Sequence, residues 1–186
     1  MNNSESVNEP LKTLLSRLYN IEDMKIQLDD GSIQTATFTF NVGADSRDIE
    51  AIESKYGIKL PEDYVSFLRL HNGAKLFDLG HGDSKHIYSL AEVDADATLY
   101  SPDISPELFP IGAYLGNTIY IDTSREDLYL FKGGSSHEFD FLGMNFTSWL
   151  IYLIMANGQP FWEWSPSCFY RTVDDRELTA QDYSGI

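Results

Sequence analysis

The hydrophobic and polar positions following residue 44 specify two short amphipathic helices. The first helix has Asp45 or Ser46 available as its N-cap, and Gly57 is able to end it. Its apolar face consists of Ile49, Ile52 and Tyr56. Because residues three or four positions apart share one side of a helix, this face is predicted to pack on a core.

The second helix is marked at both of its ends. Pro61 suits the first helical position, and Glu62 and Asp63 put negative charge at the positive end of the helix dipole. Asn72-Gly73 is able to take left-handed backbone geometry and stop the helix. The i, i+3, i+4, i+7 spacing predicts a buried stripe of Tyr64, Phe67, Leu68 and His71.

Upstream, the pattern predicts a helix and then a β-hairpin. The leucines that share one helical face are Leu11, Leu14, Leu15 and Leu18. Two extended segments, 24–28 and 33–42, flank Asp29-Asp30-Gly31. In the second segment, one face is predicted to point inward and comprises Ala36, Phe38, Phe40 and Val42. The opposite, threonine-rich face is predicted to be solvated, with contact to a partner as the alternative.

Between residues 74 and 131 the helical period is absent, and short apolar runs alternate with turn residues. These runs predict an antiparallel meander of strands at 75–79, 86–90, 111–115, 118–121 and 128–131. Gly116-Asn117 has the spacing of a two-residue hairpin turn. Helical spacing returns with Phe146, Trp149, Leu150, Leu153 and Ile154. An aromatic tail follows, which is predicted to fold back on the domain.

These motifs, in this order, resemble the SUKH superfamily, which includes fungal cell-wall-synthesis regulators and bacterial toxin-immunity proteins. The resemblance rests on the segment from Gly57 to Tyr64, on a glycine-containing hairpin at 109–122 and on a closing helix at 145–150. It implies one α+β domain with helices packed on a mostly antiparallel sheet. On this basis the chain divides into an N-terminal helix and hairpin extension (1–44), a SUKH-like core (45–158) and an aromatic C-terminal tail packed on the core (159–186).

Composition narrows the range of partners. The 186 residues include 29 acidic and 13 basic side chains, for a net charge of -16. Such a charge repels phosphate backbones and anionic lipids, so we expect neither nucleic acid nor a membrane as partner, and a basic protein is favoured. The polar N-terminus, the lack of a long apolar run and the single cysteine, Cys168, predict a cytoplasmic protein.

Candidate catalytic and metal-binding residues are weakly supported. His81, Asp83 and His86 are ligand types able to hold a metal, but their spacing fits no common zinc motif and predicts a polar loop. Cys168 is predicted to be a small buried hydrophobe, and 133–137 lacks the last glycine of a nucleophile elbow. His71 is predicted to be structural. We therefore expect no catalytic residue, no metal and no cofactor.

Charge distribution is more informative. No lysine or arginine occurs between Lys85 and Arg125. The acids of this interval, which we call the acidic interval, are Glu92, Asp94, Asp96, Asp103, Glu107 and Asp122. Tyrosines lie among them, as aromatic anchors do inside a charged interface rim. The predicted partner-binding residues are Tyr88, Glu92, Asp94, Asp96, Tyr100, Asp103, Glu107 and Tyr114. The alternative is a solvated acidic surface that only maintains solubility.

With the resemblance, these observations indicate a non-catalytic immunity protein that neutralises a nuclease-type toxin by occluding its active site. Two other functions stay open. One is a regulatory or scaffold protein of the fungal type, and the other is a metal-dependent enzyme built on His81, Asp83 and His86.

Overall fold

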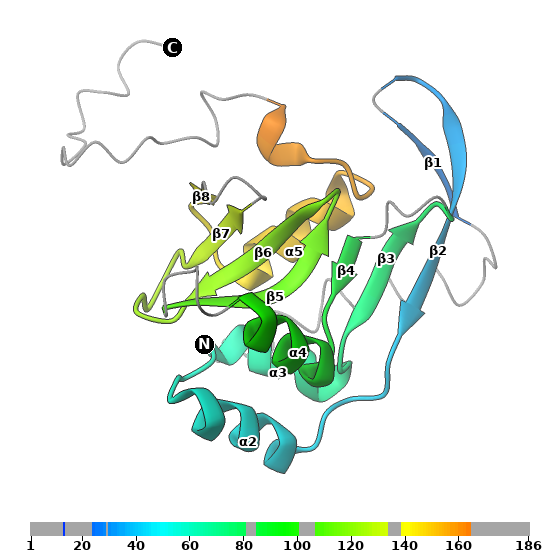
Figure 1. The fold of residues 1–186 in the computed structure, drawn as a ribbon. Helices are drawn as coiled ribbons and strands as arrows, with labels where there is room; N and C mark the ends of the chain where they lie inside the picture. Colours follow the sequence, from blue (N-terminus) through cyan, green and yellow to red (C-terminus); the bar gives the residue numbers. More distant parts are fainter. Residues whose placement is uncertain are drawn as a thin grey trace, which may run out of the picture.

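The computed structural model of the chain describes residue 13 and residues 24–28, 30–80, 85–100, 107–133 and 139–164, with the backbone alone at 99 and 100. Its strands form one antiparallel sheet whose spatial order is the order of the sequence (Figure 1). The strands are β1 (Met24–Gln27), β2 (Ile33–Phe40), β3 (Ala74–Asp78), β4 (Lys85–Ile87), β5 (Leu108–Tyr114), β6 (Asn117–Asp122), β7 (Leu130–Gly133) and β8 (Phe139–Phe141). The predicted meander and the predicted N-terminal hairpin are confirmed, and β8 is an addition to them.

The helices of the described residues are α2 (Ser46–Tyr56), α3 (Glu62–Leu70), α4 (Leu90–Tyr100) and α5 (Phe146–Met155), with a short 3-10 turn, η1 (Phe161–Glu163). In Figure 1, α5 lies behind the central strands, and α2, α3 and α4 gather at one end of the sheet. The α+β class with helices packed on an antiparallel sheet is therefore confirmed.

The first predicted helix, α2, has the expected ends. The Asp45 carboxylate accepts a hydrogen bond from the backbone N–H of Arg47, and Gly57 closes the helix at a φ of 66°. Left-handed geometry of this kind is open to glycine without steric cost. Ile49 and Ile52 are buried as predicted.

The second predicted helix, α3, packs on α5 through aromatic rings. Tyr64 and Phe67 are fully buried, and their rings lie 5.1 and 5.2 Å from the ring of Phe146. Asn145 caps α5 by accepting from the N–H of Ser148. The end of α3 differs from the prediction, because the helix stops before residue 71.

Three local predictions are corrected. His71 is the extended residue that ends α3, and its Nδ1 lies 3.1 Å from the backbone oxygen of Asn41, so it is not part of a helical stripe. Val42 is 91% exposed because β2 ends at Phe40. The hairpin turn between β5 and β6 is Leu115-Gly116, one residue earlier than predicted.

A larger correction concerns α4, which lies where only strands were predicted. The predicted strand 86–90 ends at Ile87, and the helix begins at Leu90. Ser89 and Glu92 form a capping box: the Glu92 carboxylate accepts from the Ser89 N–H at 2.8 Å, and the Glu92 N–H donates to the Ser89 hydroxyl at 3.3 Å. This Ser-x-x-Glu pair was the local signal for the helix.

The described parts of the segments on either side of the SUKH-like core pack against it, whereas the predicted leucine helix at 11–18, apart from residue 13, and the tail after residue 164 lie outside the described residues. β2 pairs with β3 along the chain from Thr37 to Phe40, so the N-terminal hairpin extends the central sheet. After α5, Phe161 and Trp162 are buried, and the ring of Trp162 lies 4.7 Å from that of Tyr114. Trp164 is 60% exposed.

Candidate functional site

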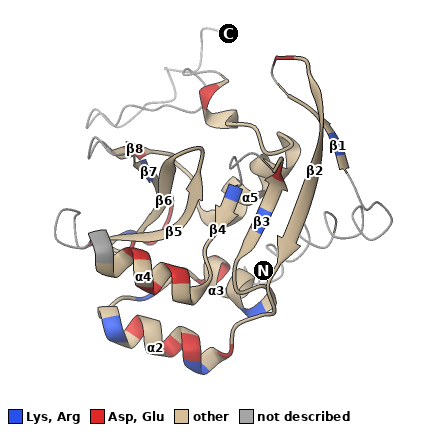
Figure 2. Cartoon of the chain, turned by 45° about the vertical axis from the view of Figure 1, so that its right-hand side comes forward, with Lys and Arg blue, Asp and Glu red and all other residues tan. Residues whose placement is uncertain are grey.

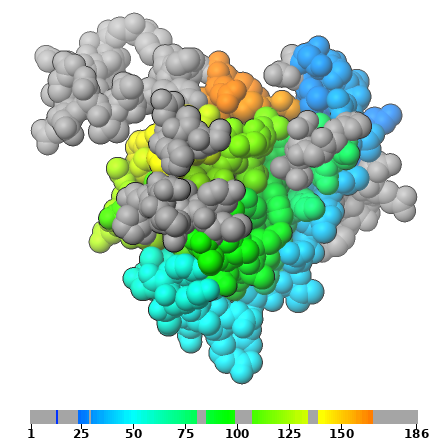
Figure 3. Space-filling model, viewed as in Figure 1, coloured from blue at the N-terminus to red at the C-terminus, as the bar shows by residue number. Residues whose placement is uncertain are grey.

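Two acidic features of the surface are candidates for a functional site. The first is the outer side of α4 with the neighbouring helix α2. Figure 2 shows acidic residues on both helices, and Figure 3 shows the cyan atoms of α2 beside the green atoms of α4 on one face. The second is a pocket between the first turns of α3 and α5.

Asp94 links the two helices of the first feature. Its Oδ1 lies 2.5 Å from the Lys55 Nζ and accepts a hydrogen bond of 2.7 Å from the Tyr56 hydroxyl. Lys55 and Tyr56, by hydrogen bonding to the ionised form, lower the pKa of Asp94. Asp94 is therefore a partly exposed acid that already has a structural contact.

Asp96, two residues further on, has the opposite environment. It is half-buried, and its Oδ2 is shielded from solvent with no hydrogen-bond partner in the described part of the chain. Partial burial disfavours the charged carboxylate and raises the pKa of Asp96. The pKa values of these two carboxylates on α4 are thus shifted in opposite directions.

Glu92 has a third role, since it connects α4 to the sheet. Besides capping α4, its Oε1 lies 3.3 Å from the Nε2 of His86 on β4. Burial is the largest influence on His86 and lowers its pKa, although Glu92 acts in the other direction. The imidazole also meets the ring of Tyr88 edge-on, with centroids 5.2 Å apart. Tyr88 is itself half-buried.

Tyr114 is not a surface anchor, contrary to the prediction. It is 2% exposed, and its hydroxyl donates a 2.6 Å hydrogen bond to the carbonyl of Gly158. Glu107 is exposed. The Tyr100 side chain and Asp103 lie outside the described residues. Four of the predicted contact residues thus lie on α4 or just before it: Tyr88, Glu92, Asp94 and Asp96. Tyr114 is buried and is no longer a candidate contact residue.

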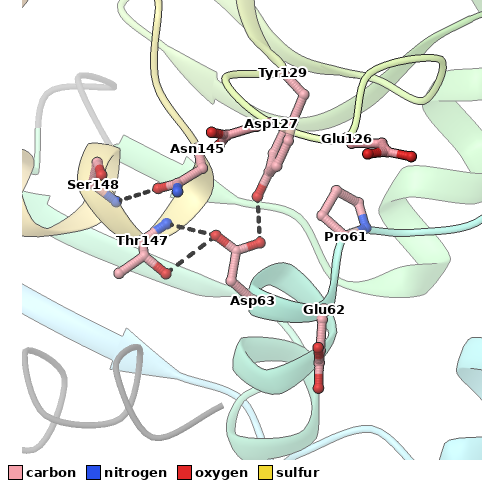
Figure 4. A pocket seen from close by; sticks show the side chains of 9 residues that line it. All are labelled: Pro61, Glu62, Asp63, Glu126, Asp127, Tyr129, Asn145, Thr147 and Ser148. Carbon is pink, nitrogen blue, oxygen red and sulfur yellow. Dashed lines mark hydrogen bonds between the residues drawn. The ribbon is translucent and has the colours of Figure 1, made fainter. Parts of the chain in front are cut away.

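The pocket between α3 and α5 has a volume of about 320 Å³. Its lining residues, drawn in Figure 4, are Pro61, Glu62, Asp63, Glu126, Asp127, Tyr129, Asn145, Thr147 and Ser148. Four of the nine are acidic and none is basic. The first turns of two helices and the loop before β7 supply the walls, so segments distant in sequence form it.

Asp63 lies at the centre of this arrangement and is 8% exposed. One carboxylate oxygen accepts from the Tyr129 hydroxyl and the Tyr64 N–H, and the other accepts from the N–H and hydroxyl of Thr147 at 3.0 and 3.1 Å. The Tyr129 oxygen in turn accepts from the N–H of Phe146. Burial and the neighbouring Asp63 charge raise the pKa of Tyr129, which stays a neutral donor.

The sequence indicated Asp63 only as an acid favoured by the α3 dipole. Its partners Tyr129 and Thr147 are 66 and 84 positions away, and no local pattern connects them. The structure shows that Asp63 also binds the first turn of α5, so one carboxylate joins the N-termini of two helices.

The weaker sequence candidates are placed only in part. Of the proposed metal ligands, His86 faces Glu92, while His81 and Asp83 lie outside the described residues. Cys168 and residues 134–137 also lie outside them. Within the described ranges, no three histidine, cysteine or acidic side chains are grouped to hold a metal ion. No helix among the same residues is both long and apolar enough to span a membrane.

Comparison with known proteins decides the family. The sequence model of the SMI1 / KNR4 family (SUKH-1) matches residues 43–152, which is more than half of the chain. The chain belongs to this family. The resemblance inferred from the helix and hairpin motifs is confirmed, and the matched SUKH-1 range includes α4 and the Asp63 pocket.

Two relatives come from Bacillus subtilis (strain 168). The chain is 32% identical to "Uncharacterized protein YobM" over 184 residues, which covers 89% of this chain and 97% of that protein. It is 29% identical to "Uncharacterized protein YnaB" over 151 residues, which covers 77% of this chain and all of that protein. Because the YobM match is longer than the SUKH-1 range, it includes part of the flanking segments.

Proposed function

We propose that this SUKH-1 protein is a non-catalytic binding protein of the immunity type. It neutralises a basic, nuclease-type toxin domain by binding over the active site or the nucleic-acid groove. The observation that carries the proposal is the acidic surface of α4 and α2, which lies in a chain of net charge -16.

The physical basis is electrostatic. A nuclease groove is lined by cations that bind the phosphates of nucleic acid. Carboxylates on two helices carry negative charge as phosphates do, but contain no phosphodiester bond that the nuclease can cleave. Opposite charges also speed the encounter of two proteins, over distances up to a Debye length of about 8 Å in physiological salt. Family membership supports the proposal, because the resemblance implies binding.

The surface that we propose for contact differs from the one predicted from the sequence, because it includes two acids of α2. Its acids are Glu92 and the partly exposed Asp94 on α4, and the exposed Asp48 and Glu50 on α2. Tyr114 is excluded from the contact surface because it is buried, whereas the half-buried Tyr88 stays at the margin of this surface.

The test measures association and dissociation rates at low and high salt against a candidate nuclease-type toxin domain, chosen from the genes that neighbour this one. Replacing Asp48, Glu50 and Asp94 together by Asn, Gln and Asn removes three charges of this surface with little change of shape. We expect binding about 10- to 1000-fold weaker, with the loss in association rate rather than in dissociation rate.

Lys55→Gln is the matched control, because Asp94→Asn also breaks the ion pair that links α2 to α4. Lys55→Gln breaks the same pair but makes the surface more negative. If charge drives binding, Lys55→Gln keeps or strengthens it. Equal weakening by Lys55→Gln and Asp94→Asn would show that only helix packing matters. Unchanged rates in the triple variant would reject this surface and favour the regulatory or scaffold function.

A further inference from the structure

One end of the sheet carries exposed apolar side chains in place of charge. No charged residue occurs in the sequence between Asp140 and Glu163, a range that includes all of α5. Met155, the last residue of α5, is 72% exposed, Trp164 is 60% exposed, and Leu115 in the β5–β6 turn is 45% exposed. We call these three side chains the apolar end. In Figure 1, the β5–β6 turn, the end of α5 and η1 lie at the same end of the sheet, away from α2.

The apolar end rests on one buried cluster. The Tyr114 hydroxyl donates a 2.6 Å hydrogen bond to the carbonyl of Gly158, and the Tyr114 ring lies 4.7 Å from that of Trp162. Leu115 directly follows Tyr114, while Gly158 and Trp162 are close in sequence to the other two exposed side chains. Exposed apolar patches of this kind often mark contact sites.

The backbone of Leu115 is a second, separate observation. Its φ of 47° is left-handed, a geometry that residues other than glycine adopt at an energetic cost. Two-residue hairpin turns of this kind favour asparagine or glycine. A half-exposed leucine therefore strains the turn and adds little to the core. We infer that contact with another segment is the reason for a leucine at this position.

The chain continues from the apolar end with a segment of matching chemistry. Residues 165–170 follow Trp164 directly, contain no charged side chain and end in Phe169 and Tyr170. A segment of six residues spans at most about 20 Å, so both rings are able to reach the surface beside Trp164. Because the segment is tethered there, its effective concentration is in the millimolar range of a short linker. A second copy has no such advantage, and its net charge of -16 repels the first.

We propose that residues 165–170 fold back over the apolar end as a strap, with the rings of Phe169 and Tyr170 covering Leu115 and Met155. The sequence predicted an aromatic tail packed on the core, and the apolar end supplies a surface for it. The strap lies at the opposite end of the sheet from α2, so it covers apolar surface and leaves the acidic surface of α2 and α4 free for a partner.

Cys168 provides the test in the full, unmutated chain. It is the chain's single cysteine, so a nitroxide spin label attached to it marks the strap alone. The label broadens the NMR signals of nuclei close to it. We expect strong broadening of the methyl signals of Leu115 and Met155, and none of the methyl signal of Ala51, an exposed residue of α2.

Variants of the strap separate docking from simple tethering. Replacing Phe169 and Tyr170 together by Ser should lower the broadening at Met155 by about threefold or more, because the apolar contacts of two rings are lost. Leu178→Ser is the control, since it removes an apolar side chain from the same tail outside residues 165–170, and it should leave the broadening unchanged.

A variant of the surface tests the other side of the contact. Leu115→Asn should lower the broadening at Met155 by about twofold or more and keep the turn, because asparagine takes left-handed geometry more readily than leucine. Leu128→Asn is the matched control. Leu128 has a φ of 50° and is 44% exposed, but it lies beyond Asp122 at the opposite end of β6, so its replacement should leave the broadening unchanged.

Three outcomes would overturn the strap. The first is the absence of broadening at Leu115 and Met155. The second is equal broadening before and after replacement of Phe169 and Tyr170, which would show a tail that is tethered but not docked. The third is broadening of an isotope-labelled chain by the spin label of another chain in a mixed sample, which would make a second copy the occupant. The test needs no toxin, so the strap and the proposed function fail separately.

Discussion

The α3–α5 pair and the α2–α4 pair join helices by different means. Between α3 and α5, the rings of Phe67 and Phe146 are fully buried, and the Asp63 carboxylate is enclosed by neutral donors. Between α2 and α4, the side chains of Lys55 and Asp94 are 52% and 37% exposed and meet at the surface. Both pairs contain a carboxylate that bridges two helices. Burial, rather than charge, distinguishes Asp63, which holds the fold together, from Asp94, which we propose to face a partner.

The largest effect is expected in the apolar part of the α3–α5 pair. Phe67→Ala should lower the free energy of unfolding by about 3–5 kcal/mol, because it removes a ring that is fully buried against Phe146. Chemical denaturation measures this loss. Arg69→Ala, an exposed neighbour on the same helix, should change stability by less than about 0.5 kcal/mol. A loss below about 1 kcal/mol for Phe67→Ala would place this ring outside the core.

Asp63→Ala should follow, with a loss of about 2–4 kcal/mol. The Tyr129 hydroxyl and both donors of Thr147 would be left in a largely buried site without their acceptor. Urea denaturation measures this loss, and the slope of the unfolding free energy against urea concentration should stay unchanged. Glu62→Ala serves as the control, because Glu62 is the exposed residue directly before Asp63, and this substitution should cost less than about 0.5 kcal/mol. Similar losses for both variants would mean that burial does not distinguish these acids.

Tyr129→Phe should cost about 1–3 kcal/mol by the same measurement. It removes one donor to Asp63 and one acceptor of the Phe146 N–H, but keeps the ring. Since Asp63 is a shared partner, the double variant with Asp63→Ala should lose less than the sum of the two single losses. Strict additivity would contradict a connected network.

The smallest effects are expected on α4 and concern pH. Asp94 has a lowered pKa in the folded chain, so its stabilising contact is fully present above the usual 3.8 and is lost as pH falls through the folded value. Asp96 has a raised pKa, so its contribution falls as pH rises from 3.8 through the folded value. Asp96→Asn should therefore raise the melting temperature at pH 7 and leave it unchanged at pH 3.

NMR titration of the side-chain carboxyls checks the cause of these shifts. Lys55→Gln should move the pKa of Asp94 upward, since it removes the largest influence that lowers it, while the pKa of Asp96 stays in place. Equal shifts of both pKa values would indicate that the electrostatic field of the whole helix, and not the Lys55–Asp94 pair, lowers the pKa of Asp94.

The sequence predicted the elements whose signals are local and complete. α2 and α3 each combined an apolar period with end signals, α5 had a strong apolar period, and the N-terminal hairpin had an Asp-Gly turn between its two extended segments. α4 was missed because Ala91, Ala95 and Ala97 weaken its apolar stripe, although its capping box was visible in the sequence.

The candidate sites were less accessible to sequence reasoning. Tyrosines among acids predicted surface anchors, yet Tyr114 is buried, since β5 turns it toward Gly158 and Trp162. The Asp63 pocket needed three segments that meet only in the folded chain. Side-chain direction and distant contacts are tertiary properties, and neither leaves a periodic pattern to detect.

The strand order of the sheet has a consequence for how the chain folds during synthesis. Because each strand pairs with the one that precedes it in the sequence, the sheet extends by adding one neighbour at a time as the ribosome releases the chain. The α3 helix cannot dock in the same stepwise way, since Thr147 and Phe146 emerge more than 80 residues after Asp63. Until α5 is present, the aromatic side of α3 lacks the cover of Phe146, so a chain that ends between β7 and α5 has most of its sheet but leaves an apolar surface exposed, as aggregation-prone folding intermediates do.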